Sequence, residues 1–406
     1  MSAIACRLNT TFTSLRNRDF RWLWLGRLAS SATFEMSGVV QGWLVYYLTG
    51  SAFALGWVSA GWSVSTLVLS LYGGAVSDRV SKRALLLWTR VAMAVNSLLI
   101  GLLISLDVIQ VWHLAASSLA TGVLFAFMMP AQQAIISDLV DRETLLNANS
   151  LNAVGMGLMG IFSASLAGQL IETVGPAAVY YVMTAAYIGA VFTIIKLPDI
   201  GPVHLSRGTI WVDLMEGIGY LKRTPILLTL LGLGLVRVLF AMPYRTLMPA
   251  FARNNMGLDA RGLGLLMASP GLGGLLSSLF LCSQGNPPEK GRILLGSGIG
   301  MGLALLIFPQ VRLLGLTLVF LALSGALNNV AMVMNSTLLQ AHADAVYRGR
   351  VLSVYMMLWG LTPLGTLPAG FLADKVGVPP VIAAQGIMVV LLFALAWRRP
   401  NLLELA

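Results

Sequence analysis

Hydrophobic residues recur along the chain in runs of about 20, separated by short polar stretches and by glycine and proline breaks. A helix of that length crosses the ~30 Å hydrocarbon core of a bilayer. The pattern therefore predicts an all-α membrane protein with twelve transmembrane helices. The predicted spans cover residues 20–48, 53–77, 84–106, 111–137, 144–172, 178–197, 226–250, 261–283, 292–309, 313–340, 350–372 and 379–397.

The longest polar interruption lies between the sixth and seventh predicted spans. It divides the chain into an N-terminal six-helix bundle (1–197), a cytoplasmic linker (198–225) and a C-terminal six-helix bundle (226–406). Within the linker, apolar residues fall at helical spacing and predict an amphipathic helix on the membrane surface. These residues are Ile210, Leu214, Ile218 and Leu221.

Composition agrees with a membrane protein that has little soluble mass. Of the 406 residues, 57% are hydrophobic and only 10% are charged, whereas about a quarter of a soluble domain is charged. Cys6 and Cys282 are too few for a disulfide framework or a metal cluster. The first 20 residues lack an apolar core, so we do not expect a cleaved signal peptide.

The charge distribution orients the predicted spans. With the N-terminus in the cytoplasm, nineteen Lys and Arg residues fall on the cytoplasmic side and four outside. The cytoplasmic set is Arg7, Arg16, Arg18, Arg21, Arg79, Lys82, Arg83, Arg90, Arg142, Lys196, Arg207, Lys222, Arg223, Lys290, Arg292, Arg348, Arg350, Arg398 and Arg399. The positive-inside rule then predicts a multi-pass cell (inner) membrane protein with both termini cytoplasmic. This distribution explains the net charge of +10 without nucleic acid as a partner.

An internal repeat supports the division into six plus six helices. The fifth span ends in "AGQLIETVGPAAVY" (167–180) and the eleventh in "AGFLADKVGVPPVI" (369–382), which match at an offset of 202. A weaker match, Leu55-Gly56 with Leu263-Gly264, relates the second and eighth spans at an offset of 208. Chance gives single matches in a glycine-rich protein, but equivalent positions favour duplication. Two related halves around a cavity are typical of transporters.

The loop between the second and third spans reads "GGAVSDRVSKR" (73–83). It resembles the signature loop of the major facilitator superfamily, Gly-x-x-x-Asp-Arg-x-Gly-Arg-Arg. The matching positions are Gly74, Asp78, Arg79, Lys82 and Arg83, while Ser81 replaces the second glycine. Further segments, among them "MPAQQAIISDLVDRETLLNANSL" and "GRVLSVYMMLWGLTPLGTLPAGFLADKVG", resemble the branch that contains the enterobactin exporter and bacterial macrolide efflux proteins.

The resemblance implies a conformational latch at this loop. Asp78 could face the positive N-terminal end of a helix from the other half, where the eleventh span begins with Arg348 and Arg350. Such a contact would hold the cytoplasmic side shut in an outward-open state. The alternative is that the basic residues only set topology. Superfamily antiporters often carry Gly-Pro in span five, where this chain has Ser163 and Ala164, so that motif does not indicate antiport here.

Glu35 is the only acidic residue placed deep within a predicted span. It follows the start of the first span by roughly 15 residues, which is over ~20 Å along a helix axis. An ionisable group at that depth is costly and by default suggests a functional site. We expect Glu35 to couple proton binding to transport, and the alternative is a structural hydrogen bond or ion pair.

Three arginines belong to neither side in this count and are left inside predicted spans, namely Arg27, Arg237 and Arg245. The repeat offset places Arg245 near the depth of Glu35, and Arg237 nearer that of Arg27. The resemblance implies that spans one and seven line the cavity. We therefore expect Glu35 to pair with Arg245, and Arg27 or Arg237 to face an anionic group of the cargo. Arg27 could instead extend to the cytoplasmic interface.

Amide and aromatic side chains supply further candidates for substrate contacts. The substrate-binding candidates among them are Gln41, Trp62, Asn152 and Asn329, and Trp43, Tyr46, Trp57, Asn149, Asn328 and Asn335 belong to the same group. Each alone more often serves helix packing. No Walker loop, nucleotide-binding pattern or metal-ligand cluster is recognisable, so we expect no enzyme activity, no cofactor and no metal.

The sequence as a whole predicts a secondary active transporter that works by alternating access. We expect proton-coupled export of an amphipathic small molecule, such as a drug or a siderophore-like metabolite. The alternatives are uptake or proton-independent facilitated transport of an organic solute, and a non-transporting membrane scaffold or sensor. The expected partners are the lipid bilayer, the small-molecule substrate and protons, and we expect a monomer.

Overall fold

A computed structural model describes residues 13–139, 142–198, 219–221, 223–284, 287, 289–344, 347–403 and 405. Within these residues the chain forms helices and short connections and no strand. The linker predicted at 198–225, including Ile210, Leu214 and Ile218, lies almost wholly outside them. The predicted amphipathic helix therefore stays a prediction.

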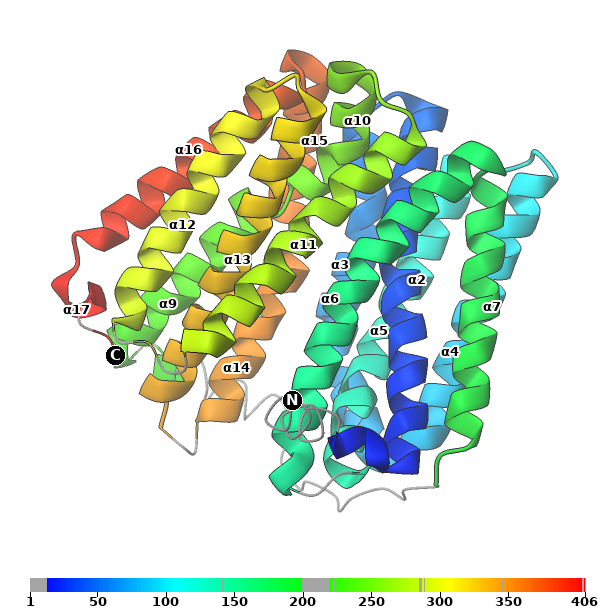
Figure 1. The fold of residues 1–406 in the computed structure, drawn as a ribbon, viewed down its shortest axis with the longest axis horizontal. Coiled ribbons are helices and arrows are strands. Elements are labelled where there is room, and N and C mark those ends of the chain that lie inside the picture. The colour runs from blue at the N-terminus through cyan, green and yellow to red at the C-terminus, as the bar shows by residue number, and fades with distance from the viewer. Residues whose placement is uncertain are drawn as a thin grey trace, which may run out of the picture.

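The N-terminal half begins with a 3-10 turn, η1 (Thr13–Arg16), and continues through six helices. These are α2 (Arg18–Thr49), α3 (Ala52–Arg79), α4 (Lys82–Ser105), α5 (Val111–Leu139), α6 (Arg142–Thr173) and α7 (Pro176–Ile195). They alternate in direction, as Figure 1 shows. We call the end of the molecule at which α2 begins the lower end, and the opposite end the upper end.

The C-terminal half repeats this arrangement with two interrupted helices. The first span is interrupted and consists of α9 (Pro225–Val236), η2 (Arg237–Ala241) and α10 (Tyr244–Met256). The next three spans are α11 (Ala260–Gln284), α12 (Lys290–Ile307) with the short turn η3 (Phe308–Gln310), and α13 (Leu314–His342). The fifth is interrupted again, as α14 (Arg348–Met357), η4 (Leu358–Leu361) and α15 (Pro363–Val376), and the sixth is α16 (Val378–Trp397). A last turn, α17 (Pro400–Leu403), follows at the lower end. The η2 segment is a π-helical turn and η4 is a 3-10 turn.

Eleven of the twelve predicted spans are long and apolar enough to cross a membrane by length and composition. The exception is α2, which is a continuous 32-residue helix but carries many polar side chains. Its position explains this composition, because α2 packs against α6 and α7 of its own half and also contacts α10 and α11 of the other. A helix enclosed by protein needs less apolar surface than one that faces lipid.

The two halves meet along two pairs of helices, α3 with α15 and α6 with α11. A Cβ atom at Gly370 would lie 2.6 Å from the carbonyl oxygen of Ala52, and one at Gly168 would lie 2.4 Å from that of Ala260. Gly370 and Gly168 differ by the 202-residue offset of the repeat, and Ala52 and Ala260 by the 208-residue offset. The sequence repeat therefore corresponds to two equivalent close contacts between the halves.

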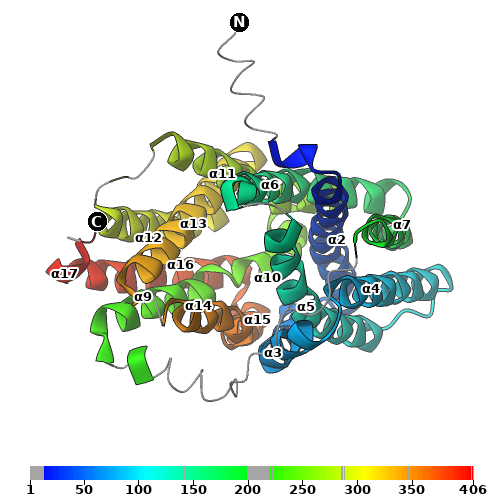
Figure 2. The same ribbon diagram turned by 90° about the horizontal axis from the view of Figure 1, so that it is seen from below.

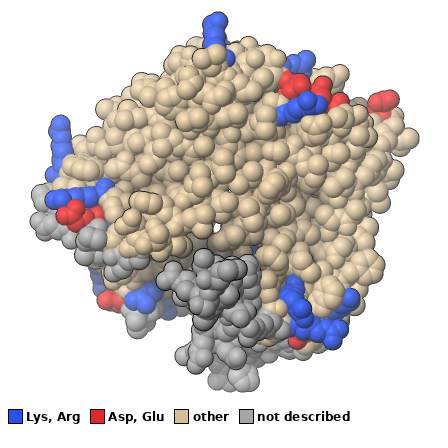
Figure 3. Space-filling model, in the orientation of Figure 1, with Lys and Arg blue, Asp and Glu red and all other residues tan. Residues whose placement is uncertain are grey.

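The described contacts between the halves lie toward the upper end. Seen from below in Figure 2, α2–α7 and α9–α17 form two groups of helices. In Figure 3 the lower edge is hollowed between the halves, and charged side chains lie near the edges of a broad uncharged face. Such a face suits a bilayer.

Candidate functional site

An ion pair joins the two halves near the middle of the molecule. A guanidinium nitrogen of Arg245, near the start of α10, lies 3.2 Å from a carboxylate oxygen of Glu35 on α2. The pairing expected from the depths of the two residues is therefore present. Both side chains are partly exposed, so the pair is accessible from the space between the halves. Its role in proton coupling stays a prediction.

Arg237 lies at the beginning of the π-helical turn η2 and is 2% exposed. Its guanidinium donates hydrogen bonds to Asn328 Oδ1 on α13 (3.2 Å) and to Tyr355 Oη on α14 (3.0 Å). Its Nε has no partner. In this conformation Arg237 therefore does not lie on an open cavity wall, because α13 and α14 of the C-terminal half enclose its side chain. π-helical turns occur frequently at functional sites.

Three aromatic rings form a cluster in the N-terminal half, and one of them is the sequence neighbour of Glu35. Trp62 on α3 lies 5.9 Å from Phe34 and 5.4 Å from Phe125 on α5, measured between ring centroids. Phe34 precedes Glu35 directly in α2 and is 46% exposed. Trp62 was predicted as a substrate contact, whereas the sequence alone did not single out Phe34 and Phe125. The trio offers an apolar surface, and Phe34 is the member that lies on the same helix as Glu35.

The other amide candidates have different surroundings. Gln41 donates to Leu114 O (3.0 Å), and Asn329 donates to Ser277 Oγ (3.0 Å) and to Ser278 Oγ (2.9 Å). These bonds join neighbouring helices of one half, so they serve packing in this conformation. Asn152 is buried with its Nδ2 unpartnered.

Arg90 differs most from its predicted environment. The charge count places it among the cytoplasmic residues, but the structure buries it at 2% exposure in α4, about two turns above the lower end. The sequence interpretation counted Arg90 on the cytoplasmic side as part of the charge distribution and did not predict this burial. Arg27 on α2, in contrast, contacts Met156 Sδ at 3.9 Å and has a buried Nη1 without a partner.

The predicted latch at the lower end is described only in part. The side chains of Gly74, Asp78 and Arg79 lie outside the described residues. Arg83 donates to Ile195 O within its own half, and Arg350 lies 5.4 Å above the ring of Tyr347 in the other. Lys82 is buried, and Arg348 is exposed. Ser81 caps α4 by accepting from Ala84 N, which explains why a serine suits this turn. The latch stays a prediction.

A contact that the sequence did not predict ties the halves at the upper end. Asp374 on α15 accepts hydrogen bonds from Ser51 Oγ (2.6 Å), Ala52 N (2.5 Å) and Phe53 N (3.1 Å) at the beginning of α3. A carboxylate is stabilised there because the first amides of a helix are unpaired and carry a partial positive charge. Asp374 is part of the segment "AGFLADKVG", which in the sequence predicted a repeat but no contact between the halves.

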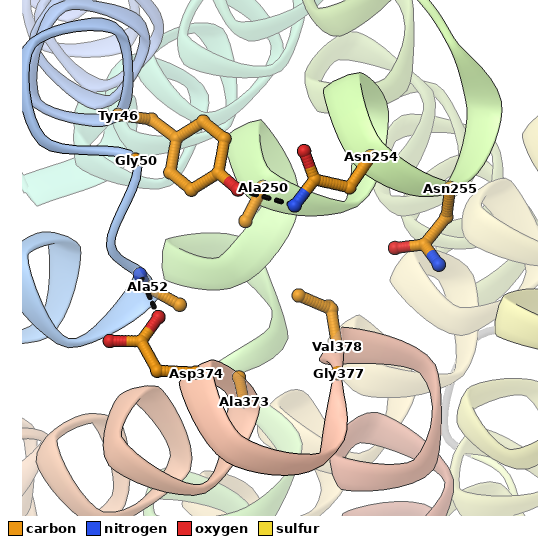
Figure 4. A pocket seen from close by; sticks show the side chains of 10 residues that line it. All are labelled: Tyr46, Gly50, Ala52, Ala250, Asn254, Asn255, Ala373, Asp374, Gly377 and Val378. Carbon is orange, nitrogen blue, oxygen red and sulfur yellow. Dashed lines mark hydrogen bonds between the residues drawn. The ribbon is translucent and has the colours of Figure 1, made fainter.

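The same upper contact encloses a small cavity of about 160 Å³ between the halves. Figure 4 shows Asp374 bonded to Ala52 on one side and Tyr46 bonded to Asn254 on another. The cavity is polar and too small for a drug-sized molecule, which needs about 300–1,000 Å³. We therefore assign it to the closure of the upper end and not to cargo binding.

We expect Asp374→Asn to weaken closure of the upper end. The substitution removes a charge-assisted cap, which contributes about 0.5–2 kcal/mol. Spin labels at Val108 and Leu313, both exposed in upper-end connections, would report the spacing between the halves by electron resonance. Compared with the wild type, Asp374→Asn should have a larger fraction of molecules with a long distance between the two spin labels. Glu172→Gln is the matched control, because Glu172 occupies the equivalent repeat position and is exposed. An unchanged distance distribution in Asp374→Asn would contradict this assignment.

The fold and the ionised centre between two helical halves define a membrane transporter and not an enzyme. The profile of the family described as "Transmembrane secretion effector" matches residues 9–404. The chain belongs to this family, which is part of the major facilitator superfamily. The sequence interpretation of the fold, the superfamily and the multi-pass membrane location is confirmed.

Curated relatives are exporters. The chain is 27% identical over 342 residues to "Enterobactin exporter EntS" of Shigella boydii serotype 18, covering 82% of this chain and 79% of the relative. The protein of the same name from Escherichia coli O1:K1 is 26% identical over 342 residues, which again cover 82% of this chain and 79% of the relative. These relatives agree with the branch that the sequence resembles.

Solved structures of transporters share the fold at low sequence identity. A mutant of the nucleoside transporter NupG has a TM-score of 0.76 at 12% identity, covering 94% of this chain and 99% of that one. A bacterial homologue of the human lysosomal transporter Spinster, in an inward-facing and unoccupied conformation, has a TM-score of 0.75 at 12% identity, covering 96% and 97%. At these identities the likeness shows the fold alone.

Proposed function

We propose that this transporter exports an amphipathic small molecule by alternating access and that protons drive the export through Glu35. The observation that carries the proposal is the Glu35–Arg245 ion pair at 3.2 Å between α2 and α10, one helix from each half. The exporters among the relatives support the direction of transport. The positive-inside rule assigns the lower end to the cytoplasm.

The ion pair couples proton binding to the separation of the halves. Separating ionised Glu35 from Arg245 would leave two opposite charges unpaired in a partly desolvated site, which is costly. Protonation neutralises the carboxyl group and leaves only the charge of Arg245 unpaired, so the penalty is smaller and the empty protein can change conformation with a proton bound. When the halves close at the upper end again, Arg245 favours the ionised carboxylate and the proton leaves toward the lower side.

Cargo has to replace the ion pair during the outward step. A molecule with an anionic or acceptor group for Arg245 and a donor group for Glu35 would satisfy both charges while the halves separate. The exposed face of Phe34, together with Trp62 and Phe125, would hold an aromatic or aliphatic part of the same molecule. Both requirements together favour an amphipathic organic molecule over an inorganic ion or a simple sugar.

Transport in everted membrane vesicles tests the proposal. With an imposed proton gradient, vesicles containing the protein should accumulate a siderophore-like catecholate or an amphipathic dye above the level in control vesicles. An uncoupler should abolish the accumulation. Cargo flux that does not depend on the proton gradient would instead support the second candidate, a proton-independent facilitator. In that case the same ion pair would only stabilise the contact between the halves. The absence of flux with every cargo would favour a scaffold.

Arg237 is enclosed in this conformation, so we propose that cargo reaches it only when α13 and α14 move apart during transport. On that basis we expect Arg237→Met to weaken binding of an anionic cargo by at least ~10-fold, equivalent to ~1.4 kcal/mol. Methionine keeps much of the length and apolar volume but removes the cation that Asn328 and Tyr355 position. Binding is measured by ligand-dependent thermal stability, with a neutral cargo as the comparison. A variant that loses stability but binds both cargoes normally would show that Arg237 has only a structural role.

A further inference from the structure

Among the described residues, four buried nitrogen donors in the N-terminal half have no acceptor. One is Trp62 Nε1 in the aromatic trio, and the other three are Arg27 Nη1, Arg90 Nε and Asn152 Nδ2 on α2, α4 and α6. All four groups donate a hydrogen bond, so the missing partner is an acceptor. A buried donor without an acceptor costs about 1–3 kcal/mol, and more when the donor is charged. Native proteins rarely keep several such groups together without a use.

These donors come from helices that pack closely together. At Gly26, α2 approaches α7 so tightly that a Cβ atom would lie 2.3 Å from Thr193 Oγ1. Tyr187, about two turns earlier on α7, is buried and lies near Arg90 of α4 and Thr33 of α2. The charges of Arg27 and Arg90 also interact with each other. Arg27 touches Met156 on α6, and Asn152 lies four residues earlier on the same helix face.

The arrangement is electrostatically unfavourable as it stands. Two like charges repel each other in surroundings of low dielectric constant, where Coulomb interactions are strongest. Among the described side chains, no carboxylate lies within the 4.0 Å of an ion pair from either guanidinium. Positive-inside topology does not explain Arg90, since a residue that only sets topology can remain in the loop or at the interface.

We propose that Arg27 and Arg90 form an oxyanion-binding site in the N-terminal half, with Asn152 and Tyr187 as neutral neighbours. The ligand is a group with several anionic oxygens, such as a carboxylate, phosphate, sulfate or catecholate. A guanidinium binds such groups through a planar pair of donors. The oxyanion belongs either to the cargo or to a free inorganic ion that enters the lower hollow. The site is separate from Arg237, which lies in the other half and already has two partners.

Anion-dependent stability of the purified full chain in lipid nanodiscs tests the proposal. Thermal unfolding is followed at constant ionic strength while sodium sulfate, phosphate or salicylate replaces sodium chloride. We expect at least one oxyanion to raise the unfolding temperature of the wild type by several degrees. Arg90→Gln and Arg27→Gln should weaken the apparent affinity at least ~10-fold. Without added oxyanion, Arg90→Gln should be as stable as the wild type, because it removes an unpaired buried charge.

One further variant makes the outcome decisive. Arg292→Gln removes an exposed arginine paired with Glu289 and should keep the full stabilisation. The stabilisation is measured without a proton gradient, so a failure of proton coupling remains distinguishable from a failure of this site. Stabilisation by sulfate or phosphate identifies a free inorganic ion, and stabilisation by salicylate alone identifies a cargo group. Equal stabilisation in the wild type, Arg27→Gln and Arg90→Gln, or no stabilisation by any of the three salts, would overturn the proposal.

Discussion

Glu35→Gln is expected to abolish gradient-driven accumulation of cargo, leaving no more than the equilibrium level reached with an uncoupler. Glutamine has nearly the shape of a protonated glutamate but cannot release a proton. It also removes the charge that Arg245 attracts across 3.2 Å, so the halves lose a tie between α2 and α10. Cargo exchange without a gradient should persist, because the halves can still separate.

The measurement compares uptake into everted vesicles with and without an imposed proton gradient. Glu35→Asp keeps the carboxylate and should retain part of the coupling. Glu289→Gln is the matched control, since it breaks an ion pair of 2.9 Å that is exposed and three residues apart in sequence. Exposed pairs of this kind contribute only about 0–1 kcal/mol. Full gradient-driven activity in Glu35→Gln would exclude Glu35 as the proton carrier.

A second large effect is expected at the glycines of the two interfaces between the halves. Gly370→Ala and Gly168→Ala would each place a methyl group against backbone atoms, 2.6 Å from Ala52 O and 2.4 Å from Ala260 O respectively. The contacted backbone belongs to the first residues of α3 and α11 and cannot move aside as a flexible side chain can. Each substitution should therefore prevent the upper end from closing and stop transport, while the helices themselves remain intact.

Distances between spin labels at Val108 and Leu313 would detect the loss of closure, and circular dichroism would check the helix content. Gly189→Ala and Gly232→Ala are matched controls, because a Cβ atom at either position has nothing within 4 Å. Alanine favours helix by up to about 1 kcal/mol over glycine, so the controls should be neutral or stabilising. Normal closure and transport in Gly370→Ala and Gly168→Ala would contradict the role given to these contacts.

The sequence predicted the features that follow from periodicity, length and depth. Hydrophobic runs located the spans, and the repeat offset placed Arg245 level with Glu35. The sequence did not predict the environment of Arg90, because a basic residue near the end of a span reads as a topology signal. The sequence also did not predict the role of Asp374, because an acidic residue at the end of one span does not indicate which helix of the other half, here α3, lies next to it. Contacts between distant helices depend on rotation about each helix axis, which hydropathy leaves undetermined.

The polarity of α2 has a consequence for how the protein is made. A first span that is not apolar enough to count as membrane-spanning gains little by entering lipid alone. It packs instead against α6 and α7, which begin at Arg142 and Pro176, more than a hundred residues after the start of α2. During translation, α2 should therefore depend on the following helix α3 to enter the bilayer and reach its final depth only when the N-terminal half is complete. Biogenesis of this transporter then proceeds by whole bundles and not by single helices.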